Sequence, residues 1–133
     1  MKKYFVFPTA IKAFFIIMAL VFSHTAKAQM IRFDTTTIYY GKLSKGDNGE
    51  REFKFYNTDK QYPLSILKVT PSCGCMVVDY PKKPIKPGQT GIIKVKYDTQ
   101  KTGFFSKTIN VLASDLYENK YTELTIKGEV VGF

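Results

Sequence analysis

The residues with the clearest chemical potential are Cys73 and Cys75, the only two thiols in a chain of 133 residues. Gly74 separates them, and Met76 follows directly. Thiols at this spacing can form a disulfide, exchange electrons with a partner dithiol, or bind a soft ion such as Cu(I) with the Met76 thioether as a third ligand. The two cysteines are therefore our candidate disulfide, and together with Met76 they are a weaker candidate metal site.

The short spacing limits what a bridge between these cysteines can contribute. Residues i and i+2 of an extended strand are too far apart for a relaxed disulfide, so a bridge requires a turn, and Gly74 would supply backbone freedom. Closing a loop of three residues is worth only about 1.6 kcal/mol, and strain would make the bridge easy to reduce. A structural disulfide, a labile dithiol, Cu(I) binding and a bridge between chains all fit the residues. Two thiolates without histidine are too few for a closed zinc site.

The N-terminus has the pattern of an export signal. Lysines give a positive start, residues 13–22 form an uninterrupted apolar run, and small residues end at Ala28. We predict a signal peptide over residues 1–28, cleaved between Ala28 and Gln29. The apolar run is too short to cross a bilayer core of about 30 Å. The mature chain, residues 29–133, is therefore expected in the periplasm or outside the cell, where disulfides persist.

Few other residues offer catalytic chemistry. His24 is the only histidine, and it lies in the predicted signal peptide. Four aspartates lie beside predicted turns, where such side chains commonly bond to local backbone groups: Asp34, Asp79, Asp98 and Asp115. The sequence shows no calcium loop, phosphate-binding glycine loop or Ser/His/Asp set. We therefore predict a protein that is not an enzyme and that needs no cofactor.

Removal of the signal peptide also changes the charge. The chain has 20 Lys and Arg against 11 Asp and Glu, a formal net charge of +9, and four of those lysines precede residue 29. The mature chain is thus mildly basic, and its lysines are scattered rather than gathered into one stripe. We expect no nucleic-acid partner, although a weak attraction to an anionic envelope surface is compatible with this charge.

The mature chain reads as strands of alternating character. Phe53 and Phe55 point opposite to Lys54, Ile93 and Val95 repeat the pattern, and turn residues separate such segments at near-regular intervals. No stretch has a helical period. Because about a hundred residues suffice for one core, we predict a single antiparallel β-sandwich of seven to eight strands.

Two segments and four tyrosines carry further expectations. Residues 64–69 and 76–80 are almost continuously apolar, which predicts strands that are buried more evenly. Four tyrosines are expected on exposed faces, where they could contact protein or sugar: Tyr39, Tyr40, Tyr117 and Tyr121. Unpaired edge strands offer another interface, because they can accept a strand from a partner.

A series of short motifs runs through the whole mature chain. It comprises Phe33-Asp34, Gly41-Lys42-Leu43, Phe53-Lys54-Phe55-Tyr56-Asn57, Pro63-Leu64-Ser65-Ile66, Ser72-Cys73-Gly74-Cys75, Pro84-Ile85-Lys86-Pro87-Gly88, Ile93-Lys94-Val95-Lys96-Tyr97-Asp98, Gly103-Phe104-Phe105-Ser106-Lys107-Thr108-Ile109 and Gly128-Glu129-Val130. The series resembles the bacterial exported DUF1573 family, whose function is unknown. The resemblance implies an immunoglobulin-like sandwich and no enzyme activity. The chain departs from the family at Met76, where threonine is common, and at Ser114-Asp115, where Ser-Asn is usual.

Two functional hypotheses follow. The first is an exported interaction or structural module that binds another envelope protein or a neighbouring domain. The alternative is a redox or Cu(I)-handling protein that acts through Cys73 and Cys75. The sequence does not specify the partner or the oligomeric state.

Overall fold

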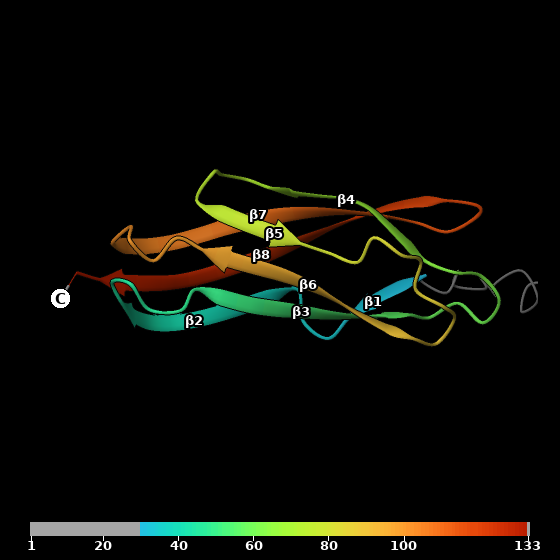
Figure 1. Ribbon diagram of the computed structural model, residues 1–133, viewed down its shortest axis with the longest axis horizontal. Coiled ribbons are helices and arrows are strands. Elements are labelled where there is room, and N and C mark those ends of the chain that lie inside the picture. Colours follow the sequence, from blue (N-terminus) through green and yellow to red (C-terminus); the bar gives the residue numbers. More distant parts are fainter. Residues whose placement is uncertain (1–29, 133) are drawn as a thin grey trace, which may run out of the picture.

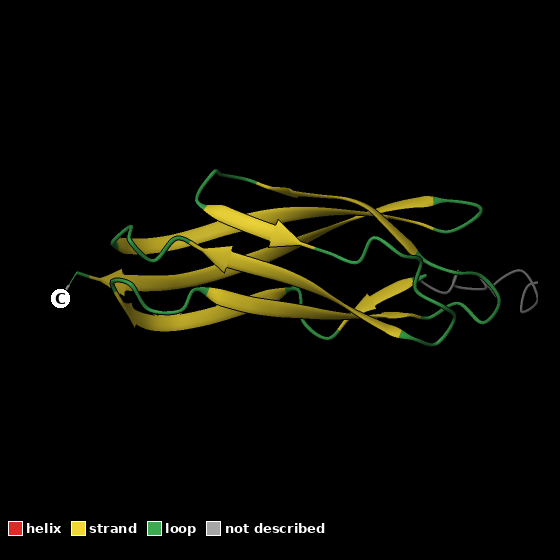
Figure 2. Ribbon diagram, in the orientation of Figure 1, coloured by secondary structure: helices red, strands yellow, loops and turns green. Residues whose placement is uncertain are grey.

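The structure, a computed structural model, describes residues 30–132. These residues form eight strands and no helix, arranged as two four-stranded sheets packed face to face (Figures 1 and 2). Within them, no helix is long and apolar enough to cross a membrane. The predicted signal peptide, its cleavage site at Ala28 and Gln29, and His24 lie outside the described residues.

Each sheet has a simple strand order. The first sheet runs β1 (Ile31–Phe33), β3 (Glu50–Asn57), β6 (Thr90–Tyr97) and β5 (Met76–Asp79). The second sheet runs β2 (Thr37–Ser44), β8 (Asn119–Val131), β7 (Gly103–Ser114) and β4 (Ser65–Pro71). The predicted all-β, immunoglobulin-like sandwich of seven to eight strands is confirmed. One pair, β2 with β8, is parallel, whereas the other strand pairs are antiparallel.

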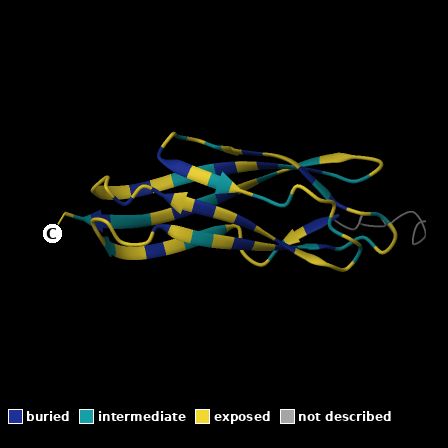
Figure 3. Ribbon diagram, in the orientation of Figure 1, coloured by how far each residue is buried: buried dark blue, intermediate teal, exposed yellow. Residues whose placement is uncertain are grey.

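Alternation along the central strands builds the core. Phe53, Phe55, Ile93 and Val95 are fully buried, as the sequence predicts, while the residues between them face solvent (Figure 3). The second sheet supplies the opposing inner face from β7 and β8. Each large side chain removed from water contributes roughly 1.5–3 kcal/mol, so these inner faces hold the sheets together.

The prediction of even burial for residues 64–69 and 76–80 is wrong. Leu67 is 50% exposed and Val77 is 69% exposed. Every strand of a two-layer sandwich has one face turned to solvent, and these two apolar residues lie on that face of β4 and β5. A largely apolar composition did not show which residues of these strands face outward.

The tyrosine prediction is right for three residues and wrong for one. Tyr39, Tyr117 and Tyr121 are exposed, but Tyr40 is only 7% exposed. The register of β2 against β8 shifts between Tyr39 and Gly41, so the extra residue at this bulge turns inward. The Tyr40 hydroxyl donates a hydrogen bond of 2.7 Å to the carbonyl of Gly49. Gly41 has a φ of 69°, which a residue with a side chain adopts only with strain.

Candidate disulfide turn and interaction surface

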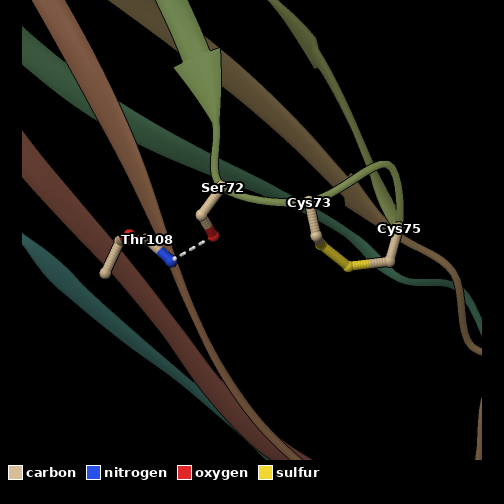
Figure 4. The surroundings of a disulfide bond; sticks show 4 residues. All are labelled: Ser72, Cys73, Cys75 and Thr108. Atoms are coloured by element: carbon tan, nitrogen blue, oxygen red, sulfur yellow. Dashed lines mark hydrogen bonds between the residues drawn. A yellow bond between two sulfur atoms is a disulfide. The ribbon is translucent and has the colours of Figure 1, made fainter.

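The two cysteines lie in the turn that connects β4 to β5 (Figure 4). Their Cα atoms are 5.2 Å apart, within the range of protein disulfides, and their sulfur atoms are at bonding distance. The turn does not depend on the glycine between them, since Gly74 has no positive φ and a Cβ there would meet no atom within 4 Å. The structure therefore brings Cys73 and Cys75 together, but the turn does not use the backbone freedom that was expected of Gly74.

Hydrogen bonds tie this turn to both sheets. The Ser72 amide donates to the Thr108 carbonyl at 2.9 Å, and the Thr108 amide donates to the Ser72 hydroxyl at 3.2 Å, which attaches the turn to β7 (Figure 4). The Cys75 carbonyl accepts a bond of 2.9 Å from the Asp98 amide, just after β6. The turn therefore links the first sheet to the second where the chain passes between them.

Burial limits what this site could bind. Cys75 and Met76 are both buried, and Cys73 packs partly buried against the same core. Among residues 30–132, no three His, Cys, Asp or Glu side chains gather where they could hold a metal. A partner protein has little access to a sulfur pair that lies between two sheets. Burial therefore favours a bridge that stays closed over one that exchanges with a large partner.

Three of the four predicted turn aspartates, Asp79, Asp98 and Asp115, accept hydrogen bonds from nearby backbone amides. Asp115 accepts hydrogen bonds from the amides of Tyr117 and Glu118 at 2.7 and 2.8 Å. Asp98 accepts one from the amide of Gln100 at 3.0 Å. These carboxylates cap turns and are not directed together as a catalytic pair.

A second feature lies on the outer face of the second sheet. We call it the aromatic hollow, an open depression of about 620 Å³ lined by Tyr39, Gly41, Phe104, Phe105, Ser106, Lys127, Gly128 and Glu129. Phe104 is 85% exposed and Tyr39 is 74% exposed, and they project from β7 and β2 on either side of β8. Phe104 was not among the aromatic residues predicted to be exposed. The Phe104-Phe105 doublet was the available signal, because only one of two neighbours in a strand can face the core.

Beside the hollow, β2 is an unusually long open edge. It is eight residues long and ends its sheet, whereas the other edge strands are shorter or interrupted. β1 has three residues, β5 has four, and β4 has a register shift between Ile66 and Lys68 before ending at Pro71. Short strands, bulges and proline discourage pairing with other chains. β2 carries a bulge of its own between Tyr39 and Gly41, but it is the longest of the four edges and contains no proline.

Comparisons with known proteins place the chain in a broad fold group. A family described as "Protein of unknown function (DUF1573)" matches residues 31–130. No curated protein matches the sequence. The ASH/PapD-like domain 7 of human CEP192 superposes with a TM-score of 0.61 at 11% identity, over 84% of this chain and 96% of that one.

Two bacterial structures share only part of their length with this chain. VesB protease of Vibrio cholerae gives a TM-score of 0.63 at 15% identity, over 85% of this chain and 35% of that one. The CupB2 chaperone of Pseudomonas aeruginosa gives 0.55 at 11% identity, over 74% and 55%. At these identities the likeness is one of fold.

Proposed function

Because the chain belongs to the DUF1573 family, whose function is unknown, we propose a role from its surface: an exported, non-enzymatic module that binds another protein of the cell envelope. The contact is the aromatic hollow together with the β2 edge. The observation that carries this proposal is the pair of aromatic rings, Phe104 and Tyr39, that stand exposed on either side of the hollow.

Exposed aromatic residues beside a depression are the usual anchors of protein interfaces. Burying the Phe104 ring in a complex would contribute roughly 1.5–3 kcal/mol. The fold is compatible with such a role, since chaperones are among the proteins that share it. VesB is a protease, but this chain spans only 35% of it, so that likeness does not argue for catalysis.

Export is part of the proposal and rests on the predicted signal peptide. An intact mass of the protein recovered from outside the cytoplasm should correspond to a chain that begins at Gln29. A chain that retains residues 1–28, or that stays in the cytoplasm, would contradict the envelope role.

A photocrosslinking experiment tests the contact itself. A photoreactive phenylalanine analogue is placed at Phe104 in the exported protein, and in a matched control it replaces Tyr121. Tyr121 is also exposed on the second sheet, eight β8 positions before the Glu129 that pairs with Phe104, a distance of roughly 25 Å along the strand.

We expect one discrete protein adduct from position 104 and none from position 121. The same analogue at Tyr39 should give the same adduct, and Phe104→Ser should reduce its yield severalfold. Equal adducts at positions 104 and 121, or none at 104 and 39, would contradict the proposed function.

A further inference from the structure

The exposed edge and the hollow together indicate how a partner binds. We propose that an extended segment of another protein adds to β2 as a further strand, with an acidic side chain beside Lys42 and an apolar side chain reaching over Gly41 into the aromatic hollow. This inference rests on the proposed function and specifies the chemistry of the partner.

The backbone of β2 is open in the middle and capped at both ends. The Thr35 hydroxyl donates to the Thr37 carbonyl at 2.8 Å and accepts from the Thr37 amide at 3.3 Å. At the other end the Asp47 carboxylate accepts from the Ser44 amide at 2.8 Å. The backbone amide and carbonyl of Thr37 thus point away from β8. Because this direction alternates from residue to residue along a strand, the amide and carbonyl of Tyr39 also point away from β8. The caps therefore frame a window, residues 38–43, in which a partner strand can pair.

The inner side of this window is incompletely covered. Ile38 and Leu43 pack against the core but remain partly exposed, because no described strand lies beyond β2. A strand added at the edge would cover both side chains with its own inward residues. The edge therefore favours a segment with apolar residues at alternate positions.

The outer side of the window leads into the hollow through Gly41. A Cβ at Gly41 would meet no atom within 4 Å, and Gly41 itself lines the hollow. Since the row of side chains on β2 is interrupted here, an aromatic or long aliphatic residue of the added strand can lie across Gly41 between Tyr39 and Phe104. The gap thus connects the edge to the exposed rings.

Charge favours an acidic segment. Three lysines lie on or beside the window: Lys42, Lys45 and Lys127, which pairs with Tyr39. Arg51 stacks on Tyr40 with its guanidinium carbon 4.3 Å from the ring centre.

The neighbouring carboxylates are already engaged. Asp47 accepts the Ser44 amide, and Glu129 lies 4.0 Å from the Lys42 ammonium, so it offsets part of that charge, while the Lys42 side chain stays 69% exposed to an incoming carboxylate. A second copy of this chain would bring the same cations against each other, so charge argues against self-pairing.

The decisive variants are Tyr39→Pro and its matched control, Tyr39→Ala. Both remove the ring, but only proline removes the amide that a partner strand needs, and proline is tolerated at an edge whose amide faces solvent. In the crosslinking experiment from position 104, we expect Tyr39→Pro to lower the adduct yield at least tenfold below Tyr39→Ala. Thermal unfolding of both variants checks that they are folded.

A synthetic peptide provides an independent probe. It is a decapeptide of alternating valine and threonine with one central phenylalanine and one glutamate; its control carries lysine in place of glutamate. The mature protein should bind the glutamate peptide at least tenfold more tightly, and Lys42→Glu should reverse this preference. Hydrogen exchange of the wild type should slow in β2 when the glutamate peptide is bound, a readout that stands even if Tyr39→Pro does not fold.

The outcomes separate the two proposals. If position 104 still crosslinks but Tyr39→Pro equals Tyr39→Ala, the interaction function stands and strand addition is wrong. Absence of slowed exchange in β2, a peptide preference independent of residue 42, or an adduct that is a second copy of this chain would also overturn strand addition. Loss of all adducts from positions 104 and 39 would instead overturn the proposed function.

Discussion

Gly91 of β6 lies directly against the ring of Phe55, its partner in the β3–β6 register. A Cβ on Gly91 would overlap the ring, and Phe55 is fully buried, so the ring has no free space into which to move. The missing side chain therefore makes room for one of the largest residues of the core, and the close contact fixes the two strands against each other.

Gly91→Ala should therefore destabilise the fold. We expect the free energy of unfolding in urea to fall by about 1–3 kcal/mol, because the added methyl group forces the ring or the strand to shift. Gly74→Ala is the matched control, since a Cβ at that position meets nothing and its φ is not positive. It should change stability by less than about 0.5 kcal/mol. Equal effects of the two substitutions would show that the contact with Phe55 is not tight.

Asn57 is the polar residue on which the loops beyond β3 depend. It is 1% exposed, its amide donates to the carbonyls of Tyr62 and Ile85 at 2.9 Å each, and its side-chain oxygen accepts from the Asp59 amide at 2.9 Å. Asn57→Asp replaces the donor with an acceptor that faces two carbonyls. We expect a loss of about 3 kcal/mol or more in urea unfolding.

Asn48→Asp is the matched control for this substitution. Asn48 is exposed, and its side-chain oxygen accepts from the Glu50 amide at 2.9 Å, which a carboxylate can also do. The expected change is within about 0.5 kcal/mol. If Asn57→Asp were equally mild, the buried amide would not organise the loops as described.

The sequence predicted the central strands well because each buries one face. Along β3 and β6 the apolar residues alternate strictly, and Phe53, Phe55, Ile93 and Val95 all lie in the core. A period of two leaves little choice of which side faces inward.

Where the alternation is weak or broken, the sequence was a poorer guide to which side chains face outward. Leu67 and Val77 are apolar, yet both lie on outer faces of the sandwich, and a largely apolar strand does not show which of its sides meets the other sheet. Tyr40 was expected on an exposed face together with Tyr39, but neighbours in a strand point to opposite sides, and Tyr40 lies inward at the bulge before Gly41. The glycine within this strand was the available signal for the bulge. The aromatic hollow was missed because it joins Tyr39 to Phe104 across β8, and the parallel pairing of β2 with β8 was not predicted.

Because of Tyr40, the free energy of unfolding should fall as the pH rises through the alkaline range. Burial raises the pKa of its hydroxyl to about 12, and the nearby Arg51 opposes this only in part. The folded state therefore holds the proton more tightly than the unfolded chain, whose tyrosines titrate near pH 10. This contribution is fully present below pH 10 and is lost as the pH rises towards 12, by about 2 kcal/mol.

Tyr40→Phe checks this assignment in urea unfolding at pH 8, 10 and 11.5. At pH 8 the variant should be less stable by about 1 kcal/mol, because the Gly49 carbonyl loses its donor. Between pH 10 and 11.5 it should lose less stability than the wild type, whereas Tyr39→Phe, at an exposed position, should follow the wild type. Parallel curves for the wild type and Tyr40→Phe would show that Tyr40 is not the group that titrates.

The cysteine pair should prove to be structural. The bridge closes only three residues, so its loop closure is worth only about 1.6 kcal/mol. Replacing both Cys73 and Cys75 by serine should cost that amount plus about 1–3 kcal/mol for the hydroxyl placed at the buried Cys75, and it should preserve the sandwich. Mass measurement after alkylation, on protein isolated from its native compartment, should find the pair fully oxidised, resistant to mild reductant and free of copper.

The substitution Met76→Leu separates the structural role from the Cu(I) hypothesis. It conserves core volume and should cost less than about 1.5 kcal/mol of stability, but it removes the thioether that Cu(I) would need. A pair that cycles, or copper that binds the wild type and is lost in Met76→Leu, would replace the structural role with the redox or Cu(I) hypothesis.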